Sequence, residues 1–450
     1  MQDVVNPKHP ILTLSLNPLR NALQNTAEKN LQLLIRLSAP QTETLKRTPL
    51  SLAIVIDRSG SMGDENMAAA LDSTIDLVNR LHDEDEVSVV SYDTRVAVEL
   101  ELMSAKEAKE QIVSRMAQIH SRGSTDLHAG WLKGVEMLAH RTNGNRMCRV
   151  ILLSDGQANH GEQNVDTICS QVARMAAAGI TTSTVGIGVG FNEMLMTAMA
   201  IAGQGTAMYG DSAQDLAEPF DAEIGLLSGL AWREVTLSIN SKTHKWTMHN
   251  DYARIRGSIS PTWRMPSIAA NSEAWMALSV PMDSAVRAQE RHPKGYALEL
   301  TIKAKDANGV EHTFHAYLPR LPVLPGSEYK ALPNDEMVYR RFTEVESADL
   351  QRAAREAVRR RDWDQVQEMF DDIERRAFDN PWLQSTVQML KVLLANRDHD
   401  RMEKELTYAS YSMKSRLSEI DEMSFNSNME EVSKSAFLRR KSYQGRRSSP

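Results

Sequence analysis

Short apolar runs alternate with helical patterns from about residue 50 to residue 230. The runs at residues 51–56 and 150–153 are almost entirely apolar, as expected for strands that are buried on both faces of a sheet. Parallel strands need helical crossovers, so this alternation predicts a mostly parallel sheet with helices on both faces. We therefore expect a Rossmann-like, doubly wound α/β domain over residues 47–230. Its helical patterns lie at residues 67–81, 105–119, 127–138 and 165–178, and a further strand pattern lies at residues 181–189.

Strand patterns flank this α/β region on both sides. Residues 11–16 and 31–37 alternate between apolar and polar side chains. After Trp232, four further strand patterns follow without a convincing helix, which predicts an accessory antiparallel β-sandwich. Because a small sheet on its own leaves backbone groups unpaired, we expect residues 1–46 to complete the sandwich of residues 231–325. The four patterns lie at residues 234–239, 274–280, 296–304 and 312–318.

The C-terminal third of the chain carries a helical pattern. Residues 335–422 follow a linker that is marked by prolines at positions 319, 322, 325 and 333. Breaks in the helical pattern fall near residues 361–362, 379–381 and 397–398. We expect a C-terminal α-helical domain over residues 326–423.

Residues 424–450 are Ser-rich and basic, and we expect them to form a disordered tail. Two arginines and a lysine precede Ser442, and two arginines precede Ser448. Both serines are therefore candidate phosphorylation sites, where a phosphate would change the local charge strongly. The alternative is a solvated terminus without a regulatory role.

Composition argues against several classes of protein. Lys and Arg total 52 against 59 Asp and Glu, a formal net charge of -7, which argues against a nucleic-acid-binding surface. No stretch approaches the ~20 apolar residues of a membrane helix, and the N-terminus lacks the layout of a secretion signal. The two cysteines, Cys148 and Cys169, have no spacing typical of a zinc site or a disulfide framework. We therefore expect a cytoplasmic protein in a reducing compartment, with no membrane span.

Polar side chains follow both of the apolar runs. Asp57 comes directly after the first run and is followed by Ser59 and Ser61, while Asp155 comes shortly after the second run. A third polar loop places Thr125 just before a helical pattern. Ligands of open parallel sheets bind outside the carboxyl ends of the strands, so we expect these side chains to meet a ligand together.

The side chains of these loops are two carboxylates and three hydroxyls, with no soft ligand. An all-oxygen set with few charges suits Mg²⁺, or Mn²⁺ at the same geometry, rather than zinc. Only two formal negative charges would face a divalent ion, which leaves the metal electrophilic. A carboxylate from another protein could then fill an open coordination position.

Other interpretations of these residues exist. Asp and Ser side chains also cap helices and stabilise turns, but the order and placement of Thr125 and Asp155 favour the metal site. Hydrolysis would need a water-activating base, for which Asp126 is the nearby candidate. The glycines at 186, 188 and 190 do not complete a dinucleotide loop, since Phe191 stands where its third glycine would fall. No Walker, His-Glu-x-x-His or Gly-x-Ser-x-Gly motif occurs.

These residues make the chain resemble a von Willebrand factor type A (VWA) domain with a complete metal-ion-dependent adhesion site. The family motif is Asp-x-Ser-x-Ser, with a Thr from a second loop and an Asp from a third. The resemblance covers the predicted α/β domain, and the flanking regions resemble bacterial and inter-alpha-trypsin-inhibitor-like members. It implies that Ser59, Ser61 and Thr125 bind the metal through hydroxyls, and that Asp57 and Asp155 act directly or through water.

The resemblance also implies a function. It implies a Mg²⁺-dependent protein–protein interaction module that binds a partner carboxylate, a cytosolic regulatory or scaffolding protein rather than an enzyme. The alternative is an accessory subunit of a AAA+ ATPase of the MoxR or chelatase type, or of a Ser/Thr kinase–phosphatase system. Gly60, Asp126 and Gly156 are expected around the metal-binding residues, where Asp126 adds a third carboxylate.

Overall fold

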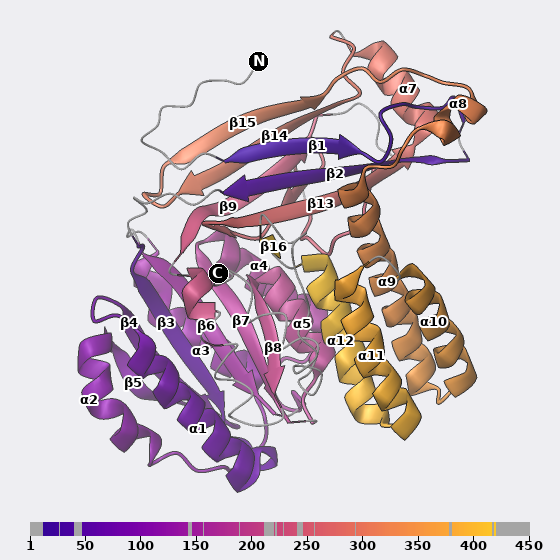
Figure 1. Ribbon diagram of the computed structural model, residues 1–450. Helices are drawn as coiled ribbons and strands as arrows, with labels where there is room; N and C mark the ends of the chain where they lie inside the picture. The colour runs from indigo at the N-terminus through magenta and orange to yellow at the C-terminus, as the bar shows by residue number, and fades with distance from the viewer. Residues whose placement is uncertain are drawn as a thin grey trace, which may run out of the picture. The chain divides into compact units, whose positions relative to one another are not determined.

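The two apolar runs become the central pair of a six-stranded sheet in the computed structural model (Figure 1). The strand order is β5 (Val96–Ser104), β4 (Glu86–Tyr92), β3 (Leu50–Asp57), β6 (Met147–Ser154), β7 (Ile180–Ile187) and β8 (Gln204–Gly210). Neighbouring strands are parallel except for β4 and β5, which are antiparallel. Every residue of β3 and β6 is buried, which explains their apolar sequences. The predicted doubly wound, mostly parallel sheet is confirmed.

Helices connect these strands. They are η1 (Gly60–Met62), α1 (Gly63–Arg80), α2 (Ala105–Met116), α3 (Leu127–Leu138), η2 (Ala139–Arg141), α4 (Val165–Ala177) and α5 (Glu193–Ala202). α3 packs against β3, β4 and β6, and α5 packs against β7 and β8. Gly134 lets α3 approach the sheet closely, because a Cβ atom at this position would lie 2.5 Å from Cγ2 of Val55.

The flanking regions form two antiparallel sheets. The first contains β1 (Thr13–Pro18), β2 (Asn30–Ala39), β13 (Ser272–Pro281) and β10 (Thr247–Met248), with β16 (Ser418–Glu419) also paired to β13. The second contains β11 (Thr262–Arg264), β9 (Leu230–Ile239), β14 (Leu298–Asp306) and β15 (Glu311–Leu318), with β12 (Ile268–Ala269) paired to β9. β2 pairs with β13 along its full length of 10 residues, so the N-terminal strands share a sheet with the region after Trp232.

The expectation that this later region has no helix is wrong. α7 (Met282–Arg291) follows β13 directly and buries Met282, Ala285 and Val286. These positions have the i, i+3, i+4 spacing of a helix, so the sequence carries a helical signal here that the expectation overlooked. Gln289 completes the buried face, because its side chain exchanges hydrogen bonds of 3.0 and 3.1 Å with the backbone of Leu321.

Further helices lie between residues 326 and 415. They are the short α8 (Gly326–Ala331), within the predicted linker, and α9 (Glu336–Arg359), α10 (Trp363–Arg376), α11 (Pro381–Asn396) and α12 (His399–Ser415). The last four are separated where the sequence predicted breaks. Asp335, Asp362 and Asn380 each cap the helix that follows, since each side chain accepts a hydrogen bond from the backbone N–H three residues later.

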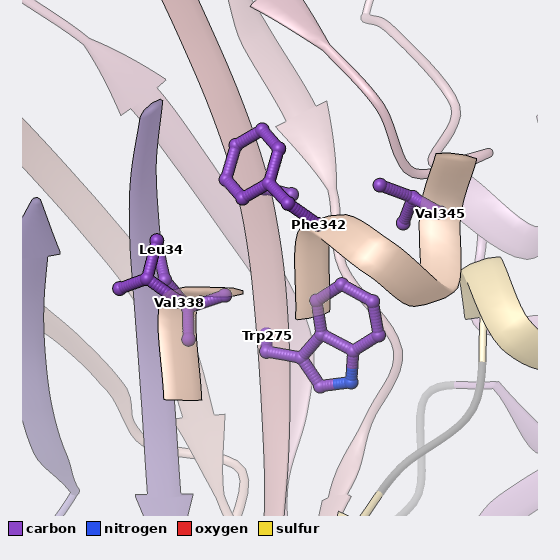
Figure 2. Close-up of a cluster of buried hydrophobic side chains, with 6 residues drawn as sticks. Leu34, Trp275, Val338, Phe342 and Val345 are labelled. Carbon is purple, nitrogen blue, oxygen red and sulfur yellow. The ribbon is translucent and has the colours of Figure 1, made fainter. Parts of the chain in front are cut away.

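α9 packs against the sheet that contains β2 and β13 (Figure 2). Val338, Phe342 and Val345 lie at helical spacing on α9, and they cluster with Leu34 of β2 and Trp275 of β13. All five side chains are almost fully buried. Because burial of one such side chain contributes about 1.5–3 kcal/mol, this cluster is a strong attachment between helix and sheet.

The described residues form two compact units. The α/β unit contains those between residues 47 and 230, together with residues 398–408 at the start of α12, and the sheet–helix unit contains the others. No helix of the described residues is both long enough and apolar enough to cross a membrane. The structure describes residues 12–26, 28–39, 47–142, 146–155, 157–188, 190–210, 220, 223–227, 229–240, 246–255, 257–292, 294–377, 380–415 and 418–419. Gly156, Ser442, Ser448 and the predicted tail lie outside these ranges.

Candidate metal centre

Asp57 is the last residue of β3, and hydrogen bonds from Ser59 and Ser154 hold its carboxylate. Oδ1 accepts one from the backbone N–H of Ser59 at 2.8 Å, and Oδ2 accepts one from the hydroxyl of Ser154 at 2.7 Å. Ser154 ends β6, the strand that lies parallel to β3. The side chain of Asp57 is therefore held at the carboxyl ends of the two central strands, where ligands of such sheets bind.

A series of hydrogen bonds runs from Ser59 to Asp155. The hydroxyl oxygens of Ser59 and Ser61 lie 3.0 Å apart, and Ser61 donates to Oδ1 of Asp155 at 2.8 Å. The amide of Asn66, near the start of α1, donates to Oδ2 of Asp155 at 3.1 Å. Both oxygens of Asp155 therefore accept a hydrogen bond. Ser59 is buried, whereas Ser61 is exposed at the surface.

Thr125 lies in a loop that the backbone ties to the segment after β3. The N–H of Gly60 donates to the carbonyl of Gly123 at 3.0 Å. Thr125 is 2% exposed, and its N–H donates to the side-chain oxygen of Asn159 at 2.8 Å. The structure thus links four of the five predicted residues by direct hydrogen bonds and links Thr125 through its loop.

Asp126, the neighbouring carboxylate, caps a helix. Oδ1 accepts a hydrogen bond from the N–H of Ala129 in α3 at 3.0 Å, and Oδ2 lies 3.3 Å from Nδ1 of His160. Gly161 leaves room for this carboxylate, because a Cβ atom there would lie 2.4 Å from both of its oxygens. Both oxygens of Asp126 are therefore engaged by its own loop and the loop after β6.

The sequence motif did not include Asp93, which comes directly after β4. Its Oδ2 accepts hydrogen bonds from Nε of Arg58 at 3.0 Å and from Nε of Arg122 at 2.9 Å, which joins three loops. Burial works to raise the pKa of Asp93, but the two arginines hold it below the usual value. The signal that could have found this residue is the one that marked Asp57, a carboxylate directly after a buried strand.

Burial disfavours the charged form of both carboxylates near the serines. It raises the pKa of Asp57 to about 6, although hydrogen bonds oppose the shift, and the nearby charge of Asp155 adds to it. Burial also raises the pKa of Asp155, against the hydrogen bonds from Ser61 and Asn66. A divalent cation beside these groups would favour the charged form of both.

The chemistry of these donors fits a hard divalent cation, since carboxylate and hydroxyl oxygens are all hard ligands. No three His, Cys, Asp or Glu side chains of the described residues gather closely enough to hold a metal ion. A metal site here would therefore need ligands beyond these side chains, such as hydroxyl groups. Ser61 is suited to this, because a hydroxyl that donates its hydrogen to a carboxylate keeps lone pairs for a cation.

The α/β unit matches a known protein family. The sequence profile of the von Willebrand factor type A domain matches residues 51–222. The chain carries a VWA domain. VWA domains are typically protein-interaction modules, and the matched residues span all six strands of the sheet described above.

Two relatives share this VWA domain at low identity. The uncharacterized protein sll0103 of Synechocystis sp. is 26% identical over 190 residues, and human inter-alpha-trypsin inhibitor heavy chain H3 is 26% identical over 191 residues. These matches cover 42% and 40% of this chain, and 44% and 21% of the two relatives. The chain thus spans less than half the length of either relative.

A solved structure resembles more of the chain. The von Willebrand factor type A protein from Catenulispora acidiphila aligns with 91% of this chain and 98% of its own, with a TM-score of 0.70 at 15% identity. At this identity the similarity shows the fold alone. Because it extends beyond the VWA domain, the antiparallel sheets and the helices also belong to an architecture that a solved protein shares.

Proposed function

We propose that the VWA domain binds one Mg²⁺ or Mn²⁺ ion and uses it to hold a carboxylate of a partner protein. The observation that carries this proposal is the series of hydrogen bonds from Ser59 through Ser61 to Asp155, which gathers oxygen donors at the ends of β3 and β6. The family match supports it, because VWA domains are typically protein-interaction modules.

Five side chains would hold the ion. Ser59, Ser61 and Thr125 supply hydroxyl oxygens, and Asp57 and Asp155 bind directly or through water. The bound metal supplies a Lewis-acidic position that accepts one more oxygen ligand from outside. Two carboxylates balance the charge of a divalent ion, so a partner carboxylate approaches a site that is neutral overall. Because Ser61 is exposed, a partner can reach the open coordination position of the metal.

We infer a regulatory or scaffolding role in the cytoplasm rather than catalysis. Asp126, the candidate for a water-activating base, caps α3 and contacts His160, which supports a binding role for the site. The spacing of Cys148 and Cys169 in the sequence, which is typical of neither a zinc site nor a disulfide framework, supports a reducing compartment.

Affinity capture with the full chain tests this function. The wild type and Ser61→Ala are immobilised and exposed to a lysate in Mg²⁺ or in chelator. Each captured protein is then purified, and its binding to both chains is measured directly. We expect binding only by the wild type in Mg²⁺, and loss of that binding when one Asp or Glu of the partner is replaced by Ala. A AAA+ ATPase, kinase or phosphatase as the partner would assign the chain to a larger assembly. Capture that is equal for both chains and insensitive to chelator contradicts the proposal.

A further inference from the structure

Asn66 contacts the candidate metal centre without belonging to its sequence motif. It is half-buried on α1, and its amide donates to Oδ2 of Asp155 at 3.1 Å. Ser61 donates to the other oxygen, Oδ1, at 2.8 Å. Rotation of the Asp155 carboxylate would break both hydrogen bonds, so Asn66 and Ser61 together fix its orientation.

The same amide also lies beside the turn that follows β7. A Cβ atom at Gly188 would lie 3.5 Å from Nδ2 and 3.6 Å from Oδ1 of Asn66. Two residues later, a Cβ atom at Gly190 would lie 2.9 Å from the backbone carbonyl oxygen of Asp155. The Asn66 amide therefore lies near the ends of both β6 and β7.

We propose that Asn66 is a positioning residue that fixes Asp155 for the metal and keeps the site to two carboxylates. This inference rests on the proposed metal-binding function. The amide is a neutral donor, so it satisfies Asp155 without adding charge, whereas a carboxylate of the same size would make the site more anionic. Mg²⁺ demands a strict geometry with few carboxylates, and Ca²⁺ accepts more oxygen ligands in flexible arrangements. Asn66 therefore favours Mg²⁺ over Ca²⁺.

Three variants of the full chain separate these effects. Asn66→Ala removes the donor, Asn66→Asp replaces the donor with a third carboxylate of nearly the same shape, and Asn79→Ala is the matched control at an exposed position of the same helix. Calorimetric titrations with Mg²⁺ and Ca²⁺ give the dissociation constants, and thermal melts in chelator report any purely structural effect.

We expect Asn66→Ala to weaken Mg²⁺ binding by roughly 10- to 100-fold, as is usual when a partner of a metal ligand is lost, with little change in the melting temperature in chelator. Asn66→Asp should shift the ratio of the two dissociation constants toward Ca²⁺, and Asn79→Ala should match the wild type. Wild-type Mg²⁺ affinity in Asn66→Ala, or an unchanged ratio in Asn66→Asp, overturns the role of Asn66. A wild type that binds neither ion overturns the proposed function itself.

Discussion

Ser61 donates its hydroxyl hydrogen to Oδ1 of Asp155 at 2.8 Å, although 94 residues separate the two in the sequence. This contact exists because β3 and β6 are parallel neighbours, so the loop after β3 and the residue after β6 meet at one edge of the sheet. It also explains why a hydroxyl is needed at position 61. A hydroxyl satisfies the buried carboxylate and still offers lone pairs to a cation.

Replacing Asp155 with Ala should weaken metal binding strongly while the fold is retained. Calorimetry of the wild type should show one Mg²⁺ or Mn²⁺ per chain, and Asp155→Ala should weaken it by roughly 100-fold or more, since a metal ligand matters at least as much as its partners do. Asp72→Ala, at an exposed position of α1, is the control and should bind as the wild type does. Equal binding by wild type and Asp155→Ala would remove this residue from the site.

The stability of the metal-free protein should fall as the pH rises through the range in which Asp57 loses its proton. Burial raises the pKa of Asp57 from 3.8 to about 6, so the folded chain holds this proton more tightly than the unfolded chain. The resulting stabilisation is complete below about pH 4 and is lost as the pH rises through about 6. Asp57→Asn removes this dependence, because an amide carries no charge at either pH.

In chelator at pH 7.5, Asp57→Asn should therefore melt at a higher temperature than the wild type. The corresponding difference in the free energy of unfolding is about 3 kcal/mol at most. At pH 4 the two should melt alike. With excess Mg²⁺ at pH 7.5 the order should reverse, since only the carboxylate pairs with the ion. A wild type that is as stable as Asp57→Asn in chelator at pH 7.5 contradicts the effect of burial.

The close packing of α3 on the sheet can be tested at Gly134. Alanine favours a helix over glycine by about 1 kcal/mol, but a Cβ atom at this position would lie 2.5 Å from Cγ2 of Val55. Such overpacking costs about 1–3 kcal/mol, so Gly134→Ala should lower the melting temperature of the chain. In a chain that already carries Val55→Ala, Gly134→Ala should lower the melting temperature by less than it does in the wild type. A higher melting temperature for Gly134→Ala in the wild-type background would show that the contact is not tight.

The predicted domain boundaries remain a proposal, which deletion of residues 1–46 tests. Without β2, the strand β13 loses its antiparallel partner along 10 residues and exposes an apolar edge. We expect the shortened chain to aggregate in light-scattering measurements, and residues 47–230 made alone to stay soluble with a cooperative melt. Removing residues 424–450 is the matched control and should change neither melting temperature nor Mg²⁺ binding. A soluble, cooperatively melting chain without residues 1–46 would argue against this organisation.

Local patterns were sufficient where one element carries its own signal. β3 and β6 are buried along their whole length, so their apolar residues marked them in the sequence. α7 was overlooked although Met282, Ala285 and Val286 have the spacing of a helix. What the sequence did not indicate is the burial of Gln289, which depends on hydrogen bonds with Leu321. A polar residue that is buried through a distant partner leaves no periodic signal.

The residues of the candidate site also fall into those that the sequence predicted and those that it did not. Spacing in the motif was enough to propose Asp57, Ser59 and Ser61, because chemistry at the end of a buried strand requires polar residues within a few positions. Asn66 escaped notice because its role depends on how α1 meets the end of β6. Asp93 carried the same local signal as Asp57, a carboxylate directly after a buried strand, and was overlooked.

The amino-acid sequence alone was enough to predict that strands and helices alternate, that two strands are buried on both faces, and that oxygen donors follow them. These properties are local, because hydrophobic periodicity and turn chemistry act over a few residues. The folded chain was needed to show that β3 lies directly beside β6 and that Asn66 and Ser61 hold the two oxygens of Asp155. The sequence predicted that the N-terminal strands join the later ones, but the partner of β2 and its register became known only from the fold. Strand order and side-chain contacts between distant residues follow from packing the whole chain, which no short segment encodes.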